Sequence, residues 1–123
     1  MNSQNGILIV DDDPQVLKLF SRILTRGGYR VHTENSGVHA IEALESAGPV
    51  DLMVLDLSMP GRDGFDILKT LRAQRPGLRV LVTSGCMGGA LLEASEFLGA
   101  TAVLNKIDAP RLLLSTVNGL LQK

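Results

Sequence analysis

Four short apolar segments of the sequence are each followed directly by polar side chains that could do chemistry. In "ILIVDDDP" the segment 7–10 is followed by three aspartates, and the other segments end in "LD", "VTS" and "LNK". The candidate reactive groups are three carboxylates, one hydroxyl and one ammonium, carried by Asp11, Asp12, Asp56, Ser84 and Lys106. Two carboxylates about 4 Å apart repel each other by roughly 4 kcal/mol at an effective dielectric constant near 20. If the fold brings these side chains together, they need a cation.

Mg²⁺ is the cation that this set of groups favours. It prefers oxygen ligands, keeps several of its waters and is commonly shared with a substrate phosphate. A carboxylate beside Mg²⁺, a hydroxyl and a lysine can also accept a phosphoryl group, because the two cations neutralise phosphoryl oxygens while the carboxylate attacks in line. The sequence therefore predicts a site for Mg²⁺ and a phosphoryl group.

Each of these residues also has an ordinary structural interpretation. An aspartate after a strand is a common helix N-cap, and Asp13 before Pro14 fits that role better than a role in catalysis. Asp56 or Ser84 alone would be a turn residue, Lys106 alone a solvated charge, and "MPGRDG" simply a turn. The coincidence of reactive groups at four strand ends favours the functional interpretation.

Apolar runs alternate with amphipathic stretches of helix length along the whole chain. The runs are predicted to be strands at residues 7–10, 30–33, 52–55, 80–83 and 102–104. Each is followed by apolar residues at helical spacing, the fourth such stretch lying at residues 91–98. The helices have predicted caps at Ser36 and Asp108 and predicted stops at Gly27-Gly28, Gly48-Pro49, Pro76-Gly77 and Gly99.

Five strands alternating with five helices predict an α/β domain, a doubly wound (βα)5 fold with a parallel sheet covered on both faces. The second run, "RVHT", is mixed in polarity and predicts an edge strand, whereas the other four are nearly all apolar. An edge position for the second strand fits the strand order 2-1-3-4-5. Ligands of such sheets bind beyond the carboxyl ends of the strands, where the reactive residues would converge.

Length and composition limit the alternatives. The 123 residues, 45% of them hydrophobic, suit one domain spanning 1–123. The net charge of −1 gives no basic footprint for nucleic acid. No apolar run is long enough to cross a membrane, and "MNSQNG" does not resemble a signal peptide, so we expect a cytoplasmic protein. The single cysteine, Cys86, excludes an internal disulfide.

The motifs "ILIVDDDP", "DLMVLDLSMPGRDGFDIL", "VLVTSG" and "LGATAVLNK" together resemble the receiver domain of two-component response regulators. The resemblance covers residues 7–121 and implies a flavodoxin-like doubly wound fold. It also implies transfer of a phosphoryl group from a phosphohistidine, which a sensor histidine kinase or a histidine phosphotransfer protein would carry, to an aspartate. Such a domain is a signalling switch, not a turnover enzyme.

The resemblance assigns roles residue by residue. Asp56 matches the phosphoacceptor. Asp11 and Asp12 match the acidic pair that holds Mg²⁺, with Asp12 expected to be the direct ligand, and the backbone carbonyl of Ser58 matches the third protein ligand beside Asp56. Two residues match groups that contact the phosphoryl group: the hydroxyl of Ser84 and the ammonium of Lys106.

Three departures from the receiver pattern bear on function. Receivers usually follow the lysine with a cis proline, whereas Lys106 is followed by Ile107 in a run one residue short, so we expect a trans bond and an altered loop. Val103 replaces the usual switch aromatic, which leaves the signal to loops such as the glycine-rich "GCMGGA". Ser58 and Cys86 lack the amide or acid that orients a hydrolytic water, so we expect a long-lived phosphoryl group.

The predicted function is a phosphorylation switch. Phosphorylation is expected to change the loop after the fourth strand and the face formed by the fourth helix, fifth strand and fifth helix. This face would bind an unidentified downstream partner or output domain. A degenerate receiver, acting as an interaction module without phosphorylation, remains an alternative. An aspartyl-phosphate phosphatase would need a general acid where Ser58 stands, and a nucleotide-binding module would need a P-loop or G-x-G-x-x-G motif. His32 and His39 are expected at the surface and not as phosphohistidines. Cys86 is expected to fill space rather than to sense redox state.

Overall fold

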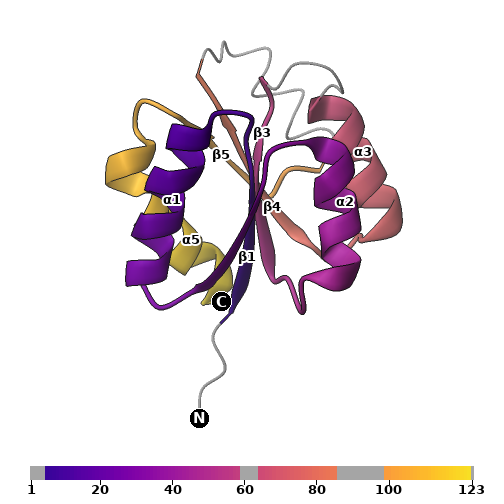
Figure 1. Ribbon diagram of the computed structural model, residues 1–123, viewed down its shortest axis with the longest axis horizontal. Helices are drawn as coiled ribbons and strands as arrows, with labels where there is room; N and C mark the ends of the chain where they lie inside the picture. Colours follow the sequence, from indigo (N-terminus) through magenta and orange to yellow (C-terminus); the bar gives the residue numbers. More distant parts are fainter. Residues whose placement is uncertain (1–4, 59–63, 86–98, 123) are drawn as a thin grey trace.

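A five-stranded parallel sheet forms the centre of the molecule (Figure 1). The computed structural model describes residues 5–58, 64–85 and 99–122. The strand order is β2-β1-β3-β4-β5, as predicted from the sequence. The strands are β1 (Gly6–Val10), β2 (Arg30–Glu34), β3 (Leu52–Asp56), β4 (Arg79–Ser84) and β5 (Ala102–Asn105).

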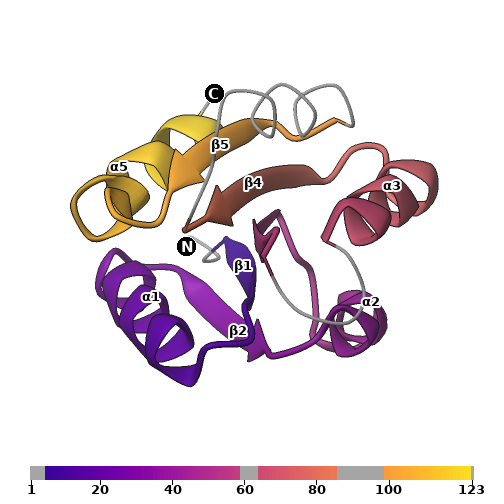
Figure 2. The same cartoon turned by 90° about the horizontal axis from the view of Figure 1, so that it is seen from above.

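Helices cover both faces of the sheet, which makes the fold three-layered (Figure 2). The described helices are α1 (Pro14–Arg26), α2 (Gly37–Ser46), α3 (Gly64–Gln74) and α5 (Ala109–Leu121). α1 and α5 lie on one face and bury one apolar cluster, the α1/α5 core, while α2 and α3 bury a second, the α2/α3 core, on the other face. The helix predicted at residues 91–98 lies outside the described residues.

Alternation along the strands decides which core each side chain enters. In β1, Ile7 and Ile9 belong to the α1/α5 core, whereas Leu8 and Val10 belong to the α2/α3 core. β1 and β3 are buried along their whole length, as strands covered on both faces should be. β2 is only partly buried, which confirms the predicted edge. β5 is also mostly half-buried despite its apolar sequence, because it forms the opposite edge of the sheet.

Two predicted N-caps are confirmed, and a third does not form. The side chain of Asp13 accepts a hydrogen bond from the backbone N–H of Gln15 at 2.9 Å at the start of α1. Ser36 caps α2 in the same way. Asp108 precedes α5 as predicted, but its side chain makes no capping hydrogen bond. The reason is its backbone, which is helical (φ −89°, ψ −11°) and not extended as in a side-chain cap.

Because the strands are parallel, their carboxyl ends all lie at the same end of the sheet. The helices run in the direction opposite to the strands, so α5 ends at the other end of the sheet, where β1 begins (Figure 1). The residues that end the strands are therefore gathered on one side of the molecule. Within the described ranges, no helix combines the length and the apolar character that crossing a membrane would require.

Candidate functional site

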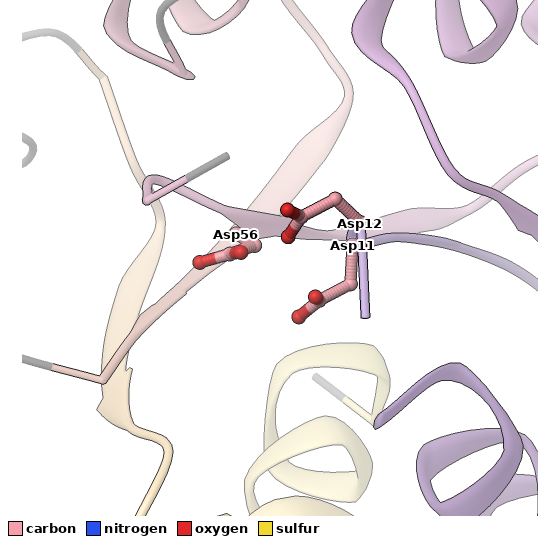
Figure 3. Close-up of side chains that lie close together, drawn as sticks. All are labelled: Asp11, Asp12 and Asp56. Carbon is pink, nitrogen blue, oxygen red and sulfur yellow. The ribbon is translucent and has the colours of Figure 1, made fainter. Parts of the chain in front are cut away.

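Three carboxylates meet at the carboxyl edge of the sheet (Figure 3). Asp11 follows β1 directly and Asp56 ends β3, and these strands are neighbours in the sheet. One oxygen from each of Asp11, Asp12 and Asp56 lies within 4.8 Å of the others. Asp11 and Asp56 are each only 1% exposed, whereas Asp12 is exposed. The convergence predicted from the strand order is therefore observed.

Lys106 bridges the two buried carboxylates. Its Nζ lies 2.7 Å from Oδ2 of Asp11 and 3.1 Å from Oδ2 of Asp56, and its side chain is 20% exposed. Because β4 lies between β5 and β3, the lysine side chain must cross the end of β4 to make these contacts. The shortened loop after Lys106 therefore does not prevent the lysine from reaching the carboxylates.

Local turns fix the second oxygen of each buried carboxylate. Oδ1 of Asp11 accepts a hydrogen bond from the backbone N–H of Asp13 at 2.9 Å. Oδ1 of Asp56 accepts two, from the backbone N–H of Ser58 at 3.0 Å and from its hydroxyl at 2.8 Å. These are Asx turns, in which an aspartate bonds the backbone two residues on. Each carboxylate is thus held in one orientation, with Oδ2 directed at Lys106.

The hydroxyl contact of Ser58 was not predicted, since the sequence pattern assigned only its carbonyl a role. A serine two residues after a strand-end aspartate is the signal that could have indicated it. The contact occupies Oδ1 of Asp56 and leaves Oδ2 with Lys106 alone among the described contacts.

Negative charges outnumber positive charges among the described residues of the site. Within this part of the chain, three carboxylates and one ammonium give the site a formal charge of −2. Burial raises the pKa of Asp11, and the charge of Asp56 raises it further; the ion pair with Lys106 and the hydrogen bond from the Asp13 backbone only partly oppose this. Burial lowers the pKa of Lys106, but the neighbouring Asp11 and Asp56 outweigh it, so the net shift is upward. The lysine stays charged, and the excess negative charge suits a divalent cation bound by oxygen ligands.

Two hydroxyl residues end β4 beside this cluster. Ser84, predicted to contact the phosphoryl group, is buried, and its carbonyl accepts a hydrogen bond from the backbone N–H of Lys106 at 3.0 Å. Thr83 pairs with Asp56 in the register of the sheet and shares the face of Leu81, which lies in the α1/α5 core. The Oγ1 of Thr83 is buried and has no hydrogen-bond partner in the part of the chain that the structure describes.

Comparison with known proteins identifies the family to which this site belongs. The family model described as "Response regulator receiver domain" matches residues 7–118. The chain belongs to the response regulator receiver domain family. The fold and family that the sequence motifs predicted are confirmed.

Curated relatives of this receiver domain are longer signalling proteins. "Response regulator MprA" of Mycobacterium ulcerans is 35% identical over 117 residues, which cover 95% of this chain and 50% of the relative. "Transcriptional regulatory protein TcrA" of Mycobacterium tuberculosis is 42% identical over 76 residues, 62% of this chain and 30% of the relative. "Sensor kinase CckA" of Brucella abortus is 33% identical over 118 residues, 95% of this chain and 12% of the relative. The chain thus spans half or less of the length of these relatives.

Solved receiver structures share the fold over almost the whole chain. A CheY-like receiver domain protein from Methanospirillum hungatei superposes with a TM-score of 0.90 at 28% identity, covering 98% of this chain and 95% of that one. The BeF3-activated receiver domain of RstA from Klebsiella pneumoniae gives 0.88 at 29% identity, covering 97% and 100%.

The structure describes most of the residues at which the sequence departs from the receiver pattern. The bond before Ile107 is trans, as expected, and Ile107 is 80% exposed. Val103 is half-buried against the α2/α3 core. His39 is exposed, and the side chain of His32 is 43% exposed, with Nε2 2.6 Å from a carboxylate oxygen of Glu34, which agrees with the predicted surface placement. Cys86 and residues 59–63 lie outside the described residues.

Proposed function

We propose that this receiver domain accepts a phosphoryl group on Asp56 from the phosphohistidine of a sensor histidine kinase or a histidine phosphotransfer protein. The observation that carries the proposal is the meeting of three carboxylates within 4.8 Å, two of them bridged by Lys106. A purely structural role does not account for three carboxylates with one counter-charge among the described residues, because such a group costs stability.

The donor set fits a bound Mg²⁺. Asp11, Asp12, Asp56 and the backbone carbonyl of Ser58 are the residues that would hold it, and all of them offer oxygen. When bound, Mg²⁺ would neutralise the excess charge of the site and of the arriving phosphoryl oxygens.

Asp56 has one oxygen suited to attack phosphorus. Oδ1 is occupied by Ser58, whereas Oδ2 faces the ammonium of Lys106. In the proposed step, Oδ2 forms a bond to phosphorus while the P–N bond breaks, and the electron pair of that bond stays on the imidazole nitrogen. The other ring nitrogen of the phosphohistidine carries a proton throughout this step, so the products are an aspartyl phosphate and a neutral histidine. Lys106 then pairs with the phosphoryl oxygens, whose charge replaces that of the carboxylate.

The hydroxyl of Ser84 is proposed to contact the same oxygens. Alternation along β4 directs its side chain to the face opposite Asp56, but Ser84 ends the strand. A phosphoryl group on Asp56 would project beyond the strand ends, where a hydroxyl from either face can reach it. A change in the segment after β4, and in the face that includes β5 and α5, would pass the signal to a partner.

The test is phosphoryl gain by intact mass after incubation with acetyl phosphate and Mg²⁺. The wild type is expected to gain one phosphoryl group and Asp56→Asn none. Asp13→Asn is the matched control, because it removes a neighbouring carboxylate while keeping a residue that caps helices equally well. If the wild type gains no mass, the domain is an interaction module that does not use phosphorylation. If Asp56→Asn gains as much as the wild type, another residue is the acceptor.

A further inference from the structure

The turn that carries Lys106 is closed by a side chain. Oδ1 of Asn105, the last residue of β5, accepts a hydrogen bond from the backbone N–H of Ile107 at 2.9 Å. The carbonyl of Asn105 accepts a second from the N–H of Asp108 at 3.0 Å, and the carbonyl of Lys106 accepts one from Ala109 at 3.3 Å. Residues 105–107 therefore form an Asx turn that leads directly into α5.

No other side chain of the described residues bonds the backbone of this turn. The side chain of Ile107 is 80% exposed and adds no packing. The carboxylate of Asp108 makes no capping bond and instead lies 3.4 Å from Nη2 of Arg111. The turn is thus held by the amide of Asn105 and by backbone bonds alone, in a run where receivers usually have a proline.

The position of this turn decides whether Lys106 reaches the site. Neighbouring strands lie about 4.8 Å apart, so β3 is about 10 Å from β5 across the sheet. The side chain of Lys106 crosses the end of β4 to place Nζ 3.1 Å from Asp56 and 2.7 Å from Asp11. Both ion pairs depend on these short distances, so a shift of the Lys106 backbone away from β4 would separate the ammonium from the carboxylates.

We propose that Asn105 is a positioning residue, whose side-chain amide holds the turn that delivers Lys106 to Asp11 and Asp56. The backbone N–H of Lys106 is anchored to Ser84 on β4, which fixes one side of the residue. The Asx turn fixes the other side. The effect of Asn105 on phosphoryl transfer rests on the function proposed above. Its effect on the position of Lys106 does not depend on that function.

The experiment has one measurement that depends on phosphorylation and one that does not. The first is the rate of phosphoryl gain from acetyl phosphate. A hydrogen bond of about 1 kcal/mol corresponds to about a fivefold change in rate, so Asn105→Ala is expected to be about fivefold slower than the wild type. Asn105→Asp keeps the Oδ1 acceptor and is expected to restore the wild-type rate to within about twofold.

The second measurement is competitive labelling of lysines with an amine reagent, followed by peptide mass spectrometry. Lys106 is held in ion pairs and is expected to react more slowly than Lys18, which is exposed on α1. Asn105→Ala is expected to raise the labelling of Lys106 relative to Lys18 about fivefold, and Asn105→Asp to leave it unchanged. Unchanged labelling in Asn105→Ala would overturn the proposal, whether or not the protein accepts phosphate.

A double-mutant cycle separates positioning from a general loss of stability. In a Lys106→Ala background, Asn105→Ala is expected to have no further effect on the rate of phosphoryl gain, because the group that it positions is already gone. An equal further slowing in that background would mean that Asn105 acts by another route and would overturn the proposal.

Discussion

Replacement of Thr83 by valine is expected to stabilise the protein, although it removes a polar group beside the site. Thr83 is 1% exposed, and its Oγ1 has no partner within the described residues. Folding therefore strips this hydroxyl of water, and none of the described residues gives it a hydrogen bond in return. Valine has nearly the same shape, so it fills the same space without the polar group and leaves no cavity.

The size of the gain follows from that balance. Burying a hydroxyl without a hydrogen bond costs about 1–3 kcal/mol on mutational scales. Thr83→Val is expected to recover about 1–2 kcal/mol, because a second methyl group takes the place of the hydroxyl in the α1/α5 core. For a domain of this length, this corresponds to a rise of about 4–8 °C in the melting temperature.

The assay is urea unfolding of the Mg²⁺-free protein, with Thr101→Val as the matched control. Oγ1 of Thr101 accepts a hydrogen bond from the backbone N–H of Val80 at 3.0 Å, and Val80 is buried. The same chemical change should therefore destabilise at position 101 by about 1–3 kcal/mol, because it leaves a buried donor unpaired. If Thr83→Val destabilises as much as Thr101→Val, the Thr83 hydroxyl has a partner in solution and the reasoning is wrong.

Three further predictions concern the metal, the pH and the packing of α2. Mg²⁺ at about a hundred times its dissociation constant should raise the free energy of unfolding by about 2.7 kcal/mol. In calorimetric scans, Asp12→Asn should not show this Mg²⁺-dependent gain. Without Mg²⁺ its free energy of unfolding should match that of the wild type to within about 0.5 kcal/mol, because Asp12 is exposed. Burial and the charge of Asp56 hold the pKa of Asp11 above its usual value. The contribution of Asp11 to the free energy of unfolding is therefore fully present below its unfolded-state pKa and is lost as the pH rises through its folded-state pKa. Urea titrations of the Mg²⁺-free protein at several pH values should show this loss in the wild type and not in Asp11→Asn. Gly37→Ala should cost about 1–3 kcal/mol in the same titration, because a Cβ there would overlap the buried side chain of Ile67. Wild-type stability in that variant would show that Ile67 can move aside.

The meeting of the carboxylates could be predicted from sequence because it depends only on topology. Asp11 and Asp56 each come at the end of an apolar strand, and parallel strands end at one edge. Once the polarity of "RVHT" indicated an edge strand, the order of the strands and the proximity of the two aspartates followed. No side-chain detail was needed for that step.

Topology also placed Lys106 at this end of the sheet, but its individual ion pairs could not be predicted, because they depend on backbone angles in a loop. The sequence favoured an altered loop, yet the lysine still reaches both carboxylates. The cap expected from Asp108 failed for a related reason. Residue type gives the tendency to cap, but the helical φ and ψ of Asp108, in a turn closed by Asn105, direct its carboxylate elsewhere.

The edge of the sheet where β1 begins and α5 ends lies opposite the carboxylates. A reporter or affinity tag fused before β1 or after α5 would therefore attach at the far side of the molecule from Asp56. Labels for surface immobilisation or fluorescence transfer can be placed at either end while the phosphodonor keeps open access.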